Sequence, residues 1–276
     1  SDNFNKCLVK TSSEFWSKFE TELSLVFVFT SIDPVFNSLL IEYVTTGPPS
    51  FVGIMVSKNS FLLILKLSFS YQLKNQLNEC KVAIVSSAGF IVNKKLKPFD
   101  TNIKFGDASY RIIPHNIKSY YLREYQKSNE FDHAGIVNDP FSAIPLPHLI
   151  DLANEGIIGS VSERHISLMG ATINTSKLLK KTIPEIVNIF KTDEVDIALF
   201  IPVWPMCHQT VGLVQKICEE NNIICSTISI IDEITIKLKT KRYISVPYQL
   251  GYPLGPIGDY NQQKNTTKKL LYEITV

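Results

Sequence analysis

The sequence predicts an α/β fold in which an open, mostly parallel sheet is flanked by helices in a Rossmann-like arrangement. Short β-branched runs occur at 81–90, 195–202 and 223–230, amphipathic helical patterns accompany them, and the two kinds of element alternate. Strands that are joined by helices pair in parallel, because a parallel pairing needs a long crossover connection. We interpret residues 80–276 as this α/β domain.

The first elements of the domain are a strand and, after a long interval, a helix. The run KVAIVSSAGF (81–90) is typical of a buried strand that ends in a Ser-Ser-Ala-Gly turn. Residues 91–143 have little periodicity and predict a loop-rich region. In PLPHLIDLANEG, Pro147 can start a helix and Gly156 can end it.

The second half of the domain repeats the pattern of strand and helix. Thr182 and Glu185 have the spacing of a capping box at the start of an amphipathic helix. The run VDIALFIP (195–202) is apolar enough for a strand that is covered on both faces. The remaining expected elements are a helix over TVGLVQKICEENN, a strand over IICSTISI, a helix after Asp232, a strand over YISVP and a closing helix over NQQKNTTKKLLYEI.

Residues 1–79 differ from the rest of the chain. They are apolar and β-prone without a rhythm of helix and strand, so we expect an appended segment or an interface layer. The most apolar windows, Leu23–Phe29 and Phe61–Phe69, are far shorter than the roughly 20 residues of a membrane span. The first residues also lack the order of a signal peptide. We therefore predict no membrane span.

Charge and cysteine content restrict the classes of partner and compartment. The chain has 28 basic and 26 acidic residues and a net charge of +2, which gives no field that attracts nucleic acid. Its five cysteines are irregularly spaced and odd in number, as is typical of a reducing compartment. We expect a cytoplasmic protein that binds a small-molecule substrate. Binding to a protein partner and assembly into a homo-oligomer are both left open.

A candidate reactive group follows the strand at 195–202. Ligands of open α/β sheets bind beyond the carboxyl ends of the strands, and Cys207 and His208 lie there. The amino end of the next helix and a neighbouring imidazole would both lower the pKa of the Cys207 thiol. The prolines around Trp204 would hold this thiol on a restricted loop. Burial of Cys207 as an ordinary core residue is the alternative, and we interpret Cys218 and Cys225 as core.

Two other segments could supply groups to the same crevice. Arg164 and His165 are expected in a loop after a helix, and residues 129–140 carry further carboxylates and imidazole. A possible iron or zinc site would use His, carboxylate and thiolate ligands, although no pair has the close spacing of a zinc motif. The candidate ligands are Glu130, Asp132, His133, His165 and Cys207.

Several stretches from about Lys81 to the C terminus occur in the order of a known family. They are VAIVSSAGF, YRIIPHNI, FDHAGIVNDPFSAIPLPHLIDLANEGIIGSVSERHISLMG, PEIVNIFKTDEVDIALFIPVWPMCHQTVGLVQKICEENNI and GYPLGPIGD. In these stretches the chain resembles the selenoprotein B component of the glycine, sarcosine and betaine reductases, specifically its shorter relatives. The resemblance implies a reductase component that acts on a small nitrogen- or sulfur-containing substrate.

The resemblance also implies an incomplete redox pair. In the reductases of this family, a selenocysteine or cysteine three positions before a second cysteine attacks the substrate carbon next to nitrogen. The matching positions here are Trp204 and Cys207. An indole cannot act as such a nucleophile, so the two-centre chemistry does not carry over.

Three functions remain open from the sequence. The first is a thiol-dependent enzyme with Cys207 as thiolate and His208, His165 or His133 as acid or base. The second is a non-catalytic accessory or ligand-binding subunit, and the third is a metal-dependent enzyme. The residues expected to contact the substrate are Trp204, Gln209, Arg164 and Met169.

Overall fold

The computed structural model divides the chain into two compact units, Ser1–Leu67 and Ser68–Val276. It describes residues 73, 75–92, 97–104, 106–126, 128–129, 131–172 and 175–275, and the backbone of three strands before them. The expected boundary after residue 79, and the expected role of residues 1–79 as an interface, stay predictions.

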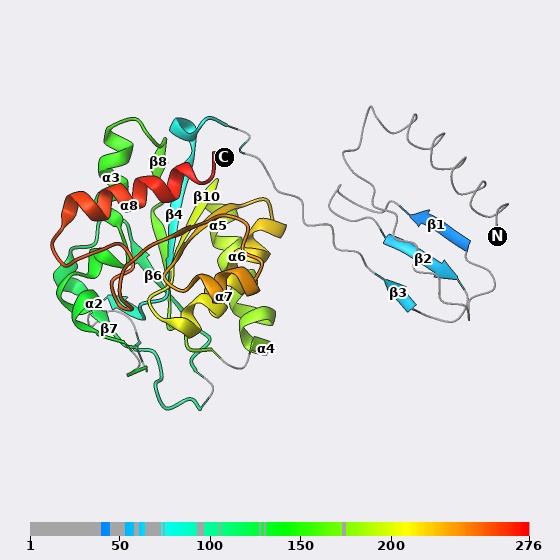
Figure 1. The fold of residues 1–276 in the computed structure, drawn as a ribbon, viewed down its shortest axis with the longest axis horizontal. Coiled ribbons are helices and arrows are strands. Elements are labelled where there is room, and N and C mark those ends of the chain that lie inside the picture. Colours follow the sequence, from blue (N-terminus) through cyan, green and yellow to red (C-terminus); the bar gives the residue numbers. More distant parts are fainter. Residues whose placement is uncertain are drawn as a thin grey trace. The chain divides into compact units, whose positions relative to one another are not determined.

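The first unit contains a small antiparallel sheet. Its strands are β1 (Leu40–Val44), β2 (Gly53–Ser57) and β3 (Phe61–Leu63), and they pair in the order β1-β2-β3 (Figure 1). This sheet agrees with the β-prone character of the segment. The apolar window Leu23–Phe29 and Cys7 lie outside the described residues.

The second unit is built on a seven-stranded sheet with the order β12-β11-β10-β4-β9-β6, in which β8 also pairs with β4. Neighbouring strands are parallel except β6 and β9, which are antiparallel. The α/β fold with an open, mostly parallel sheet is therefore confirmed. The strands are β4 (Lys81–Ser86), β6 (Tyr110–Pro114), β8 (Ser160–Val161), β9 (Arg164–Leu168), β10 (Ile197–Ile201), β11 (Ile224–Ser229) and β12 (Tyr243–Ser245).

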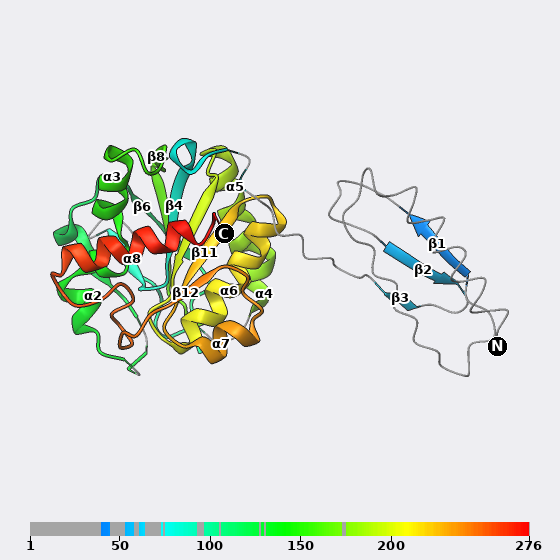
Figure 2. The same ribbon diagram turned by 45° about the horizontal axis from the view of Figure 1, so that its top comes forward.

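Helices cover both faces of this sheet (Figures 1 and 2). Alternate residues of β4 point to opposite faces: Val82 and Ile84 pack with α3 and α8, whereas Ala83 and Val85 pack with α5 and α6. None of the helices in the described part of the chain combines the length and apolar character that crossing a membrane requires. The helices are α2 (Ala134–Asn138), α3 (Leu146–Asn154), α4 (Thr175–Lys177), α5 (Ile183–Thr192), α6 (Pro205–Glu220), α7 (Asp232–Lys237) and α8 (Tyr260–Tyr272).

The region 91–143 contains more regular structure than its sequence predicts. A two-stranded sheet pairs β5 (Phe90–Val92) with β7 (Leu122–Glu124), and β6 forms the antiparallel edge of the main sheet. Strand β6 was missed because its five residues, YRIIP, include an arginine and a proline and show no alternation. The loop expected around Arg164 and His165 is likewise wrong, since both lie in β9.

The capping box predicted at Thr182 is also wrong. A π-helical turn (Leu178–Thr182) links α4 to α5, so Thr182 lies inside a continuous helical segment with φ −63° and ψ −48°. Its hydroxyl donates instead to the carbonyl oxygen of Ala108, at 2.6 Å. The Thr182 hydroxyl therefore makes a long-range hydrogen bond to Ala108 and does not cap the start of α5.

Candidate functional site

The candidate site lies at the carboxyl edge of the main sheet, between the end of β10 and the first turn of α6. Trp204 has extended φ and ψ and is the N-cap of α6, and Pro205 occupies the first helical position. The backbone N–H of Cys207 donates to the carbonyl oxygen of Trp204, at 3.0 Å. Cys207 and His208 therefore belong to the first turn of α6, and the prediction that they lie on a loop is wrong.

The Cys207 thiol is enclosed on all sides. Its exposed fraction is 0%, and its sulfur lies 3.6 Å from the carbonyl oxygen of Ser87 and 3.8 Å from the amide nitrogen of Gln126. Burial raises the pKa of the Cys207 thiol to about 11, although hydrogen bonds from the backbone and from Gln126 oppose this rise. The lowered pKa predicted from the helix end is therefore wrong, because desolvation by burial is the largest contribution to the pKa of this thiol.

Gln126 closes one side of this thiol site. Its amide nitrogen donates to the carbonyl oxygens of Ser87 and Met169, which follow β4 and β9. Its amide oxygen is buried and has no hydrogen-bond partner within the described part of the chain. Gln126 thus links the ends of β4 and β9 next to the Cys207 sulfur. Its amide oxygen is a hydrogen-bond acceptor without a donor among the described residues.

Trp204 forms a wall beside the thiol site. It is 6% exposed, and its ring stacks on that of Phe131 with centroids 6.4 Å apart. Phe131 in turn stacks on His133, whose ring nitrogens lie 2.6 Å from the carbonyl oxygen of Ser128 and 3.2 Å from a carboxylate oxygen of Glu124. The indole N–H of Trp204 is buried and unpartnered among the described residues. Trp204 therefore packs as an apolar surface.

His208 is held away from the thiol. Its Nδ1 lies 3.0 Å from the carbonyl oxygen of Trp204, and its Nε2 accepts the backbone N–H of Ile230 at 3.2 Å. This pattern requires a neutral ring with the proton on Nδ1, and burial lowers the pKa of His208. Both nitrogens are therefore used in linking α6 to the end of β11.

Arg164 and His165 do not share the site with Cys207. His165 accepts the backbone N–H of Ile84 on its Nδ1, at 3.0 Å, and burial lowers the pKa of His165 to about 3. Arg164 binds Asp193 through two nitrogens, at 2.8 and 2.5 Å, at the amino end of β9. At about 3.3 Å per residue, the five-residue strand β9 places Arg164 about 13 Å from Leu168, at the end of the strand away from Cys207.

The candidate metal ligands are not brought together. Within the described residues, no group of three His, Cys, Asp or Glu side chains could hold a metal ion. Asp132 accepts the hydroxyl of Tyr252 at 2.5 Å, whereas His165 lies inside the sheet. Glu130 lies outside the described residues. The described geometry gives no support to an iron or zinc site.

The two other expected substrate contacts differ in exposure. Gln209 is exposed on α6, whereas Met169 is fully buried against Ile91 and Phe99. The sequence reasoning missed Gln126, Ser87 and Gly170, which surround the thiol. The turn after β4 and the Met-Gly pair after β9 signal two of them, but nothing in the local sequence singles out Gln126.

Comparison with known proteins gives a distant relation. The chain is 26% identical over 190 residues to D-proline reductase subunit gamma of Acetoanaerobium sticklandii, and the match covers 68% of this chain and 76% of that protein. No family model matches the sequence, and no solved structure matches it. The chain is therefore distantly related to a component of an amino-acid reductase, which agrees with the coarser part of the resemblance.

Proposed function

We propose that this chain is an accessory, ligand-binding component of a reductase system for small amino compounds, and that it does not supply the attacking nucleophile. The support for a reductase component is the relation to D-proline reductase subunit gamma. Because that relative is one subunit of an assembly, the proposal includes a protein partner. The specific amino compound is left open.

One observation carries the choice of an accessory role. The Cys207 thiol is 0% exposed and burial raises its pKa to about 11, so at neutral pH it is a protonated thiol enclosed by protein atoms. A thiolate is required for nucleophilic attack on carbon or sulfur. The position three residues earlier is Trp204, which has no nucleophilic atom of this kind.

A thiol-dependent enzyme is the second candidate, and a specific observation favours it. The amide oxygen of Gln126 and the indole N–H of Trp204 are both buried without partners among the described residues. Unfilled polar atoms of this kind carry a cost that a bound ligand could remove. A ligand that separated Gln126 from the sulfur would also open the thiol to solvent.

Turnover by the purified full chain distinguishes the two candidates. The chain is incubated with dithiothreitol and glycine, sarcosine, betaine or D-proline, and the reduced product is measured for the wild type, Cys207→Ser and the control Cys7→Ser. The accessory role predicts no turnover in any of the three. Turnover that is lost in Cys207→Ser and kept in Cys7→Ser would overturn it and establish the thiol enzyme.

Ligand binding tests the remaining part of the proposal. Of the two tryptophans, Trp16 and Trp204, a Trp16→Phe variant keeps only the one beside Cys207. We expect at least one of the four amino compounds to change the emission of Trp204 in a saturable way without being reduced. Unchanged emission with all four would contradict a ligand-binding role at this site.

A further inference from the structure

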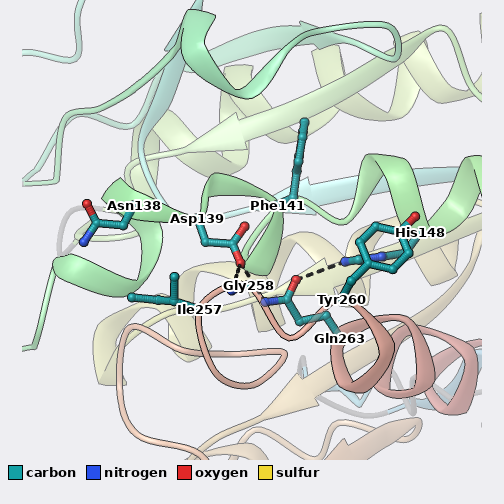
Figure 3. Close-up of a pocket in the computed structure, with 8 residues that line it drawn as sticks. All are labelled: Asn138, Asp139, Phe141, His148, Ile257, Gly258, Tyr260 and Gln263. Atoms are coloured by element: carbon teal, nitrogen blue, oxygen red, sulfur yellow. Dashed lines mark hydrogen bonds between the residues drawn. The ribbon is translucent and has the colours of Figure 1, made fainter.

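A pocket lies apart from Cys207, between α2, α3 and the start of α8. Its volume is about 250 Å³. Figure 3 shows the side chains that form it. They are Asn138, Asp139, Phe141, His148, Ile257, Gly258, Tyr260 and Gln263.

The polar side of the pocket is a fixed chain of hydrogen bonds. One carboxylate oxygen of Asp139, Oδ2, accepts the backbone N–H of Gly258 at 2.9 Å and the amide nitrogen of Gln263 at 2.8 Å (Figure 3). The same amide nitrogen donates to the carbonyl oxygen of Pro256, at 2.7 Å. Both hydrogens of the Gln263 amide are thus used, and its side chain, which is 2% exposed, cannot rotate freely.

This chain of hydrogen bonds determines which ring nitrogen of His148 carries the proton. The amide oxygen of Gln263 is an acceptor and lies 3.1 Å from Nε2 of His148, so Nε2 carries the proton. The second nitrogen, Nδ1, is then a lone pair, buried and without a partner among the described residues. Burial also lowers the pKa of His148, so the ring is neutral at pH 7. His148 therefore does not cancel the charge of Asp139.

The fixed charge of the lining is negative. Among the eight lining residues, Asp139 has the only charged side chain at neutral pH, and no donor of the described residues reaches its second oxygen, Oδ1. The nearby ammonium of Lys264 is already paired with Asp151 and Glu155, at 3.2 and 2.6 Å. Two hydrogen-bond acceptors of the lining, Oδ1 of Asp139 and Nδ1 of His148, thus have no donor among the described residues.

The remaining walls are apolar and aromatic. Phe141, Ile257 and Tyr260 line the pocket, and the Tyr260 ring packs edge-on against His148 with centroids 4.4 Å apart. The Tyr260 hydroxyl donates to Asp151 at 2.8 Å, so it is directed to a carboxylate outside the lining. Aromatic faces next to a carboxylate favour organic cations over inorganic ones.

We propose that this pocket binds a small organic ammonium ion with an apolar body and no carboxylate. The ammonium donates to Oδ1 of Asp139, and the apolar body packs against Phe141, Ile257 and Tyr260. A carboxylate on the ligand has no cationic partner in the lining, so a free amino acid is disfavoured. The site is independent of the proposed function, because it shares no residue with the surroundings of Cys207.

Calorimetric titration of the full chain tests the charge selectivity. The probes are piperidinium, its neutral isostere tetrahydropyran, and pipecolate, which adds a carboxylate to the piperidine ring. We expect saturable binding of piperidinium with a Kd of about 10 mM or tighter, and binding of the other two at least ~10-fold weaker. Equal binding of tetrahydropyran, preference for pipecolate, or no saturable binding of piperidinium would overturn the proposal.

Variants assign the binding to this pocket. Asp139→Asn removes the charge and places a donor next to the ligand, and we expect piperidinium to bind at least ~10-fold more weakly. Glu233→Gln, at an exposed residue of α7, changes the net charge equally outside the lining and should alter binding by less than ~2-fold. Ile257→Lys, at a side chain that is 43% exposed and therefore tolerant, supplies a competing ammonium and should abolish binding. Wild-type affinity in Asp139→Asn or Ile257→Lys would refute the assignment.

Discussion

Gly170 lies so close to Cys207 that a methyl group on its Cα would be 2.4 Å from the Cys207 sulfur. The same methyl group would lie 3.0 Å from Cβ of Ser87, and Gly170 has a φ of +75°, which favours glycine. The ends of β4 and β9 and the first turn of α6 therefore meet at a point where only glycine fits. The thiol is a packing element of this junction.

Gly170→Ala tests this packing. We expect the free energy of unfolding to fall by about 3 kcal/mol, because the methyl group meets the sulfur and the backbone is strained. Urea denaturation followed by circular dichroism measures the change. In a Cys207→Ala background the same substitution should cost about 1–2 kcal/mol less, since the sulfur is gone and the strain remains. Equal costs in both backgrounds would contradict the contact.

Cysteine labelling tests the burial of the Cys207 thiol. The chain has five cysteines, and a Cys7→Ser variant keeps the four that are buried. The pKa of Cys207 is raised to about 11, so we expect less than about one label per folded chain at neutral pH and four after denaturation. Mass spectrometry identifies the labelled residue. Rapid modification of Cys207 in the folded protein would restore the thiolate hypothesis.

His165 makes the stability of the fold depend on pH. The folded pKa is about 3, below the ordinary value of 6.5, so the unfolded chain binds more protons between these values. Stability is therefore fully present above pH 6.5 and falls as the pH drops toward 3, by at most about 1.4 kcal/mol per unit for this group.

The variant His165→Asn isolates this contribution. Its side-chain oxygen can accept the N–H of Ile84 without titrating in this range, and the other buried imidazoles, His148 and His208, are unchanged. Denaturation midpoints from neutral pH down to about pH 4 should fall less steeply in the variant than in the wild type. Parallel slopes would show that His165 does not remain neutral in the fold.

Arg164→Ala distinguishes a structural ion pair from a substrate contact. The guanidinium is about a third exposed and pairs with Asp193, so we expect a loss of about 1 kcal/mol or less in unfolding free energy. Ligand-dependent emission of Trp204 should not change, because Arg164 lies at the opposite edge of the sheet. Loss of that signal in a stably folded variant would place Arg164 near the ligand.

Elements with strong local patterns could be predicted from the sequence. The apolar run of β10 and the helical pattern of α6 identified both elements and the sheet edge that carries Cys207. The start of α6 was missed because Pro-Trp-Pro suggests a loop, whereas proline is also favoured at the first position of a helix. Because the expected helix started too late in the sequence, Cys207 was assigned to a loop and not to the first turn of the helix.

The electrostatic state of the site could not be predicted in the same way. The sequence indicates that a helix starts close to Cys207, but the enclosure by Gln126 depends on a contact between residues 81 positions apart. That enclosure decides the pKa of the thiol, since desolvation is the largest contribution. Likewise, the adjacency of Cys207 and His208 in the sequence suggests a catalytic pair. In the structure, the His208 ring is instead hydrogen-bonded to the carbonyl oxygen of Trp204 and the backbone N–H of Ile230.

Both outer strands of the main sheet have a proline at or close to their carboxyl end, and β12 is also short. Strand β6 runs from Tyr110 to Pro114, and β12 has only three residues and is followed two positions later by Pro247. Proline cannot donate to a strand ladder, and short edges present few free backbone groups. The sheet is therefore a poor template for extension by another chain, which protects it from edge-to-edge aggregation and directs any assembly to its helices and loops.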